Sequence, residues 1–130
     1  MRNFIIDLFV IVALLFFSRC SNDDKIEPSF SLIGKTYAAE AYEDLFDDGY
    51  DYWVYRFLNE TEVERTTRKL SPTGGIIGNA EITTYTLNYP ALIIKSTMSE
   101  SYISCEFINE KTFRYQGAYK LYEYQLIEKK

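Results

Sequence analysis

The sequence of 130 residues contains no histidine, only two cysteines and a single tryptophan. Without histidine the chain can form no Ser-His-Asp or Cys-His catalytic arrangement, no imidazole metal site and no histidine general base. A structural zinc site would have to draw four ligands from two cysteines and carboxylates, which is an unusual donor set. We therefore expect a protein that is not an enzyme and that carries no metal and no other cofactor.

Positive charge is also scarce, because the chain has 14 lysines and arginines and 19 aspartates and glutamates. Its net charge is therefore −5. No basic stripe interrupts this excess of negative charge along the chain. Nucleic-acid phosphates would repel such a chain, so the composition disfavours nucleic acid as a partner.

The chain has one long apolar run, FIIDLFVIVALLFF at residues 4–17, which Arg2 precedes. A positive start followed by an apolar run is typical of a signal peptide. The run is shorter than the roughly 20 residues that a membrane-spanning helix requires. The sequence therefore predicts an exported protein.

The apolar run ends in LLFFSRCSNDD at residues 14–24, where a cysteine directly follows it. This arrangement resembles the lipobox of bacterial lipoproteins, with Phe17 and Arg19 where a lipobox usually has leucine and a small residue. The resemblance implies that Cys20 becomes the first mature residue and carries lipid. The protein would then be anchored to a membrane of the bacterial cell envelope, in particular the outer membrane. A plain cleaved signal and an uncleaved anchor are the alternatives.

On this interpretation the chain comprises a lipoprotein signal peptide at 1–19, a flexible tether at 20–31 and one β-barrel domain at 32–130. The SNDD segment behind Cys20 resembles the Ser/Asp-rich tethers of lipoproteins from the Bacteroides group. The length that remains corresponds to one domain.

Period-two alternation dominates the rest of the chain. The segment YDYWVYRFL at 50–58 places Trp53, Tyr55 and Phe57 on one face, which is the signature of a strand. The same pattern, with turn signals between most segments, predicts strands at 36–43, 50–58, 61–69, 80–89, 91–97, 101–108, 111–116 and 118–127.

Eight short strands with short connections predict an all-β fold, namely a small antiparallel up-and-down barrel of eight strands. Closure into a barrel would remove the exposed edges that invite aggregation. An immunoglobulin-like sandwich is the alternative, but the Cys-Trp-Cys pattern of antibody domains is absent.

The segments LIGKTYAAEAY, YWVYRFLNETEV and TTYTLNYPALIIKS carry a family resemblance. Together they resemble the lipocalin-like small lipoproteins of Bacteroides-type bacteria. Those proteins have Leu-x-Gly with an aromatic residue soon after it, an aromatic strand, and a tyrosine-containing strand that leads into an apolar one. Here Tyr37 stands one place later than the tryptophan of the lipocalin Gly-x-Trp motif. The resemblance implies a lipocalin-like barrel and leaves ligand binding open.

If the barrel binds a small apolar ligand, we expect Trp53, Tyr55, Phe57 and Tyr85 to line the site. The simpler interpretation of the same face is a filled core, because side chains nearly fill an eight-stranded barrel. A filled barrel would serve a structural role or bind an envelope protein through its outer tyrosines and the 71–79 loop. A carboxylate-dependent hydrolase is the third hypothesis, although the sequence does not show which acidic residues would pair.

Two loops are also candidates for sites. EDLFDDGYD at 43–51 is expected to be a solvated hairpin end, with a calcium site as the alternative, although Phe46 stands where an EF-hand loop needs a ligand. SPTGGIIGN at 71–79 lacks the phosphate-loop pattern and is expected to be a flexible hairpin tip. At that tip Ile76 and Ile77 would fold over a barrel mouth or touch a partner.

The second cysteine, Cys105, shares a strand face with Ile103 and Phe107. Its expected state is a buried free thiol that packs as a small apolar group. A disulfide with Cys20 and a reactive nucleophile are the alternatives.

Overall fold

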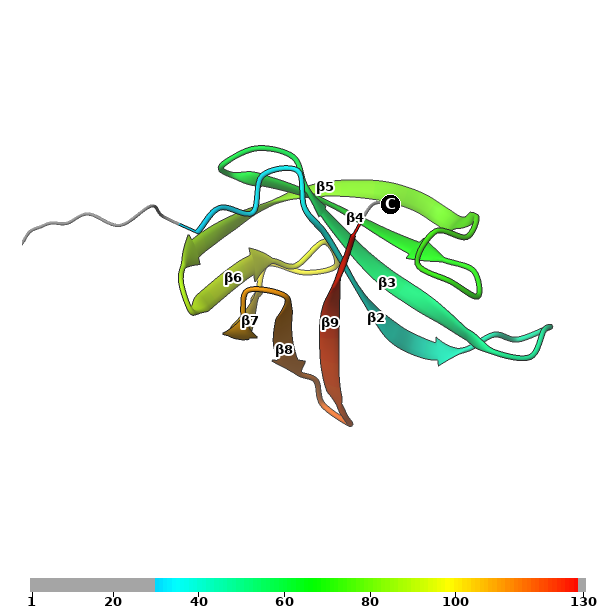
Figure 1. Cartoon of the computed structure of the whole chain (residues 1–130). Coiled ribbons are helices and arrows are strands. Elements are labelled where there is room, and N and C mark those ends of the chain that lie inside the picture. The colour runs from blue at the N-terminus through cyan, green and yellow to red at the C-terminus, as the bar shows by residue number, and fades with distance from the viewer. Residues whose placement is uncertain (1–29, 129–130) are drawn as a thin grey trace, which may run out of the picture. The chain divides into compact units, whose positions relative to one another are not determined.

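The computed structural model describes residues 30–128, so the predicted signal peptide, Cys20 and nearly all of the predicted tether lie outside the described residues. Within this range the chain forms strands and no helix, and thus no helix with the length and apolar character that a membrane crossing requires. The strands are β2 (Thr36–Glu43), β3 (Tyr50–Phe57), β4 (Glu62–Arg68), β5 (Ile76–Asn88), β6 (Ala91–Lys95), β7 (Tyr102–Asn109), β8 (Thr112–Gln116) and β9 (Leu121–Ile127) (Figure 1).

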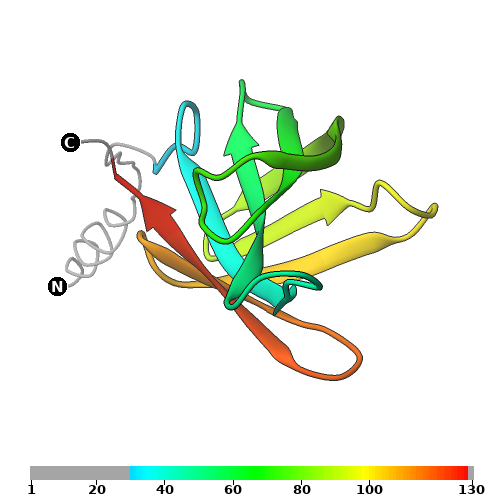
Figure 2. The ribbon, with the colours of Figure 1, turned by 90° about the vertical axis from the view of Figure 1, so that its right-hand side faces the viewer.

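These eight described strands form a closed antiparallel barrel in which consecutive strands pair with one another. The last strand returns to the first, so that Ile127 of β9 lies opposite Thr36 of β2 and Gln125 lies opposite Ala38. The ring of strands can be followed in Figure 2. Closure gives the backbone groups of both outermost strands a partner. The predicted all-β, eight-stranded, up-and-down barrel is confirmed, and the sandwich alternative is wrong.

Most strand bounds lie within three residues of the prediction, and β5 differs most. It was expected at 80–89, but it begins at Ile76. The prediction of a flexible hairpin tip at 71–79 is therefore wrong for its second half. Ile76 and Ile77 pair with β4 and are about half exposed, at 47% and 39%.

A bulge explains why β5 continues so far. Arg65 and Thr67 are two positions apart in β4, whereas their partners in β5, Glu81 and Ile77, are four positions apart. Strand β5 therefore has two extra residues at this point. Gly78 has a φ of 77°, a left-handed conformation that glycine adopts without a steric penalty. Gly78, which was expected in a loop, thus allows β4 and β5 to stay paired on both sides of the bulge.

The barrel has two ends, and the connections alternate between them. The near end, where β2 begins, holds the turns at 58–61, 89–90 and 110–111, and the far end holds the loops at 44–49, 69–75, 96–101 and 117–120.

The segment before β2 covers the near end. The Leu32 side chain is only 1% exposed. The backbone N–H of Gly34 donates to the carbonyl of Phe57 at 2.8 Å, and the N–H of Phe57 donates to the carbonyl of Lys35 at 2.9 Å. The chain is therefore fixed to β3 before it becomes a strand.

Inward-facing aromatic and aliphatic side chains fill the near half of the barrel. The rings of Tyr37 and Phe113 lie 5.2 Å apart, and those of Phe107 and Phe113 lie 5.1 Å apart. The side chains with 1% exposure or less include Tyr37, Phe57, Val63, Leu92, Ile94 and Phe113. Burial of this much apolar surface is the main stabilising term of the fold.

Candidate functional site

A cavity of about 270 Å³ lies inside the barrel, toward the far end. Its walls are Trp53 and Tyr55 from β3, Arg65 from β4, Ser96, Thr97, Met98 and Ser101 from the 96–101 loop, Tyr102 and Ile103 from β7, Tyr115 from β8 and Tyr124 from β9. The wall thus combines five aromatic side chains with hydroxyl groups at the loop and one cationic side chain. A concave, largely apolar pocket with a few polar groups is the usual form of a small-molecule site.

Trp53 forms one wall of the cavity and contacts groups from three other strands. Its ring centroid lies 4.8 Å from that of Tyr122 and 6.5 Å from that of Tyr42. The guanidinium carbon of Arg65 lies 5.4 Å from the ring centroid of Trp53, within the range of a cation–π contact. Because the chain has a single tryptophan, tryptophan fluorescence reports on the surroundings of Trp53, which include this cavity.

Two buried tyrosines form the floor. The rings of Tyr55 and Tyr124 lie 5.3 Å apart, and the side chains are 3% and 2% exposed. Burial raises the pKa of Tyr55 to about 12, although the charge of Arg65 acts in the opposite direction. Burial likewise raises the pKa of Tyr124 well above its usual value. Both phenols therefore stay protonated at neutral pH and can donate hydrogen bonds.

The other two predicted lining residues lie elsewhere in the core. Phe57 and Tyr85 pack against each other edge to face, with ring centroids 4.8 Å apart, and neither borders the cavity. The hydroxyl of Tyr85 donates to the carbonyl oxygen of Asn59 at 2.6 Å, in a near-end turn. Of the four predicted residues, the structure brings Trp53 and Tyr55 to the cavity and places Phe57 and Tyr85 in the filled half.

Arg65 is the cavity residue that the sequence prediction missed. It lies directly opposite Tyr55 across the β3–β4 pair, so its side chain shares the inward face. Its side chain is 21% exposed, and its nearest carboxylate oxygen belongs to Glu81, 3.8 Å away. The signal was present in the sequence, since Arg65 follows the apolar Val63 at period two and therefore faces the core with it.

Within the part of the chain that the structure describes, Cys105 is a buried free cysteine. It is 5% exposed, and burial raises the pKa of its thiol to about 12. The thiolate is the reactive form of cysteine, so this side chain packs as an apolar group at neutral pH. This agrees with the prediction of a buried free thiol.

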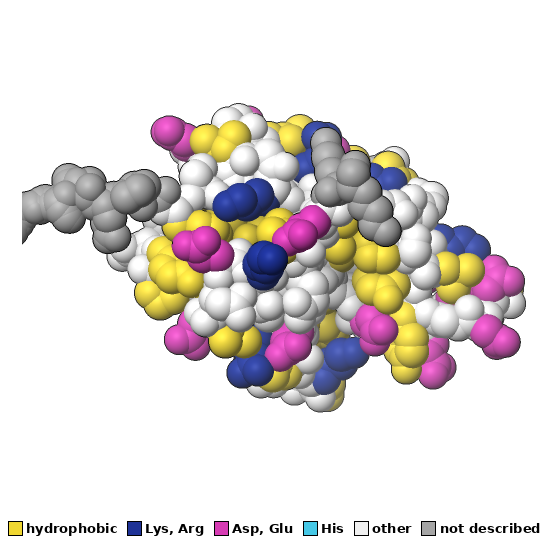
Figure 3. All heavy atoms as spheres, in the orientation of Figure 1, with side chains coloured by type: hydrophobic (Ala, Val, Ile, Leu, Met, Phe, Trp, Pro, Cys, Tyr) yellow, Lys and Arg dark blue, Asp and Glu magenta, His cyan; other side chains and the backbone are white. Residues whose placement is uncertain are grey.

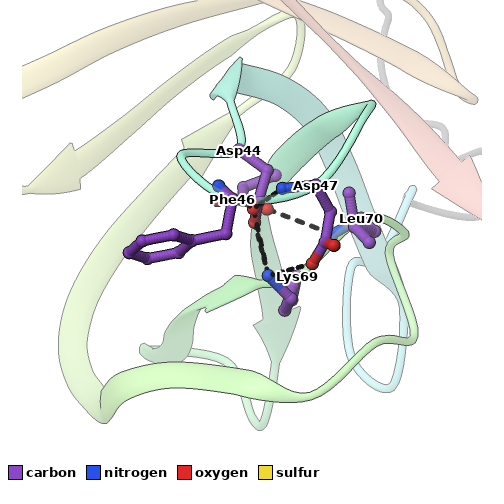
Figure 4. A network of polar contacts seen from close by, with 6 residues as sticks. Asp44, Phe46, Asp47, Lys69 and Leu70 are labelled. Carbon is purple, nitrogen blue, oxygen red and sulfur yellow. Dashed lines mark hydrogen bonds and ion pairs between the residues drawn. The ribbon is translucent and has the colours of Figure 1, made fainter.

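The acidic loop between β2 and β3 is organised by one lysine (Figure 4). The ammonium nitrogen of Lys69 lies 2.9 Å from Oδ2 of Asp44 and 3.0 Å from Oδ2 of Asp47. Oδ1 of Asp44 accepts hydrogen bonds from the backbone N–H groups of Phe46 and Asp47, both at 2.9 Å. Oδ1 of Asp51 accepts one from the N–H of Leu70 at 3.1 Å. We call this set the loop clasp, because it joins the 44–49 loop to the 69–75 loop.

The expectation of a solvated hairpin end is therefore wrong for two of the acidic residues. The Asp44 side chain is 4% exposed and Asp51 is 3% exposed, because the 69–75 loop covers them. Among the described residues no group of three or more histidine, cysteine or acidic side chains is arranged to hold a metal ion.

A second hollow, of about 500 Å³, lies on the outside of β2 and β9 beneath Pro72. Its wall includes the outward-facing Glu40, Tyr52 and Gln125. On the face shown in Figure 3, acidic and basic side chains are interspersed with apolar ones. The interior cavity has the more aromatic wall and is the better candidate site.

No family model, no curated protein and no solved structure matches this chain. The resemblance to lipocalin-like lipoproteins, the signal peptide and the lipidation of Cys20 stay predictions.

Proposed function

We propose that this protein is a non-enzymatic lipoprotein of the bacterial cell envelope whose barrel binds a small molecule in the Trp53–Tyr55 cavity. The observation that supports ligand binding is the cavity itself, an aromatic-walled space of about 270 Å³ in a barrel that is otherwise packed. In this proposal Arg65, Tyr115 and Tyr124 join Trp53 and Tyr55 as lining residues. Phe57 and Tyr85 are assigned to the core instead.

The chemistry of the described residues supports the non-enzymatic part of the proposal. No carboxylate belongs to the cavity wall, whereas a carboxylate-dependent hydrolase needs two that flank its substrate. The best-buried carboxylates, Asp44 and Asp51, belong to the loop clasp instead. The thiol of Cys105 is protonated at neutral pH.

The anchoring part of the proposal rests on the sequence of the N-terminus. Lipid chains on Cys20 would hold the protein on a membrane, since each buried methylene contributes about 0.8 kcal/mol. The chain joins the barrel at its near end, where Thr36 begins β2, whereas the cavity borders the far-end loop at 96–101.

A mass measurement tests the anchor. The intact protein extracted from its host's membranes should have the mass of residues 20–130 plus a diacylglyceryl group and an acyl chain. An unlipidated mass with a different first residue would contradict the lipoprotein proposal.

Ligand binding is tested with small aromatic compounds, followed by Trp53 fluorescence and by the midpoint of thermal unfolding. A compound that binds the folded state should change the fluorescence saturably and raise the midpoint. Ile103→Phe should fill part of the cavity and abolish both effects. Ile93→Phe is the matched control, because Ile93 lies on the neighbouring strand, 41% exposed and outside the cavity. If no small compound binds the unaltered protein, this part of the proposal fails.

The second candidate function is a protein-interaction role, and exposed side chains at the far end favour it. Each of three loops presents large apolar groups, namely Leu45 and Phe46 at 87% exposure, Met98 at 82% and Tyr119 at 99%. Exposed apolar groups at one end of a domain are typical of contact surfaces. Substitution of Phe46 and Tyr119 by serine would reduce binding to an envelope protein but leave small-molecule binding unchanged, because neither residue borders the cavity.

A further inference from the structure

The cavity contains a cation among aromatic rings, and this combination selects a class of ligand. The inference developed here rests on the proposed small-molecule binding and specifies its chemistry. Arg65 projects inward beside Tyr55 and Trp53, and its side chain is largely shielded, at 21% exposure. A guanidinium in such a place is costly unless an anion or several hydrogen-bond acceptors face it.

The protein itself provides Arg65 with a distant anion. The closest contact to Glu81 joins Nη1 and Oε1 at 3.8 Å, and the Glu81 side chain is 46% exposed. By comparison, the outward-facing Arg56 lies 3.1 Å from Glu64, and Arg114 lies 2.9 Å from Glu123. A charge-assisted hydrogen bond has a length of about 2.7–2.9 Å. Arg65 therefore hydrogen-bonds the side chain of Tyr55 and lies over the Trp53 ring but has no close carboxylate, whereas its outer counterparts each have one.

A guanidinium has five N–H donors in a planar fork, and this geometry matches a carboxylate. The neighbouring phenols of Tyr55 and Tyr124 are protonated and can add donors toward the same anion. The cavity wall contains no acidic residue, and the carboxylate of Glu81, 3.8 Å from Arg65, is 46% exposed and can be displaced toward solvent. The polar part of the site is thus suited to a single carboxylate group.

The remaining wall is suited to a flat apolar group. Trp53, Tyr55, Tyr115 and Tyr124 present ring faces and edges to the space. An apolar cavity of about 150 Å³ is large enough for benzene, so 270 Å³ accommodates one ring with a short substituent.

We propose that the cavity binds a small aromatic monocarboxylate, whose carboxylate pairs with Arg65 and whose ring packs between Trp53 and the tyrosines. Entry of the ligand would replace the long contact to Glu81 with a bidentate pair. The aromatic ring of the ligand would lie against Trp53, so binding changes the fluorescence of that residue.

The test uses the full-length protein and three probes: benzoate, its neutral analogue benzamide, and propionate, which has the carboxylate but no ring. Trp53 fluorescence gives the dissociation constants. Benzoate should bind at least tenfold more tightly than either benzamide or propionate, the scale of one charge-assisted pair or one buried ring. Arg65→Gln should weaken benzoate binding about tenfold or more and leave benzamide binding within about twofold. Arg56→Gln, which removes the same charge from the outer surface, should change neither.

The outcomes separate this inference from the function on which it rests. Equal affinities for benzoate and benzamide in the unaltered protein would overturn the carboxylate assignment and leave small-molecule binding intact. This comparison needs no variant, so it holds even if Arg65→Gln does not fold. Failure of every aromatic probe to bind the unaltered protein would overturn both proposals.

Discussion

The ammonium nitrogen of Lys69 lies 2.9 Å from Oδ2 of Asp44, and this ion pair connects two loops that are 25 positions apart in sequence. The Asp44 side chain is 4% exposed, so it depends on the lysine for its charge partner. Removal of one member of a shielded pair leaves the other without compensation. The loop clasp is therefore the polar feature that joins the 44–49 and 69–75 loops at the far end of the barrel.

We expect Lys69→Met to lower the midpoint of thermal unfolding at pH 7 and to make the 44–49 loop more sensitive to proteases. Lys95→Met is the control, because Lys95 pairs at 3.3 Å with Glu100, whose side chain is 99% exposed. Exposed pairs contribute little to stability. Equal midpoints for the two variants would show that the clasp does not stabilise the fold.

The two buried aspartates of the clasp respond to pH in opposite directions. The hydrogen bond from Lys69 lowers the pKa of Asp44 below its usual 3.8, so its stabilisation is present above that value and is lost as the pH falls through the lowered pKa. Burial, together with the hydrogen bond to Asp44, raises the pKa of Asp51. Its stabilisation is therefore complete below 3.8 and is lost as the pH rises through the raised pKa.

Asp51→Asn should consequently make the protein more stable at pH 7, because the neutral asparagine carries no ionisation cost in the site whose burial raises the pKa of Asp51. The asparagine carbonyl can still accept the hydrogen bond from the N–H of Leu70. The gain should disappear when both proteins are compared below pH 3.8, where Asp51 is protonated in the folded and unfolded states. Thermal midpoints measured across this range check the prediction, and a less stable variant at pH 7 would contradict it.

Tyr85→Phe should separate the roles of the core and the cavity. It removes the hydroxyl that donates to the carbonyl of Asn59 at 2.6 Å, and the expected loss of stability is about 0.5–1.5 kcal/mol. Urea unfolding measures that loss. Because Tyr85 does not border the cavity, the affinity for an aromatic probe should stay the same. A large change in that affinity would contradict the assignment of Tyr85 to the core and indicate that it contacts the ligand.

The thiol of Cys105 should be inert to disulfide reagents at pH 8 in the native protein. Its pKa is raised to about 12 by burial, so the reactive thiolate is scarce. The measurement uses a Cys20→Ser variant, in which Cys105 is the remaining cysteine, and compares the rate of modification before and after unfolding in urea. Rapid modification of the folded protein would instead indicate an accessible thiolate.

The strands and their inward faces could be predicted because a strand's side chains alternate strictly. Tyr37, Tyr55 and Phe113 each belong to an aromatic or apolar set at period two, and all three lie inside the barrel. The number of strands and the short connections then favoured closure. For these features the local pattern and the tertiary structure agree.

Part of the site could not be predicted, because alternation gives the face of a side chain but not its depth along the barrel. Trp53 and Phe57 share one face of β3, yet Trp53 borders the cavity and Phe57 is packed near the other end. That depth is set by the stagger between strands and by the rings that arrive from β5, β8 and β9. No single segment of the sequence contains this information.

The sequence by itself determined which residues form strands, which face inward, and that Cys105 would pack as an apolar group. The tertiary structure alone decided which inward residues border empty space, that Arg65 stands among aromatic rings, and that the 69–75 loop shields Asp44 and Asp51 from water. The physical reason is the distance along the chain over which each effect acts. Alternation and turn preference act over a few residues, whereas cavity shape and burial of charge depend on groups that meet only after the barrel has closed.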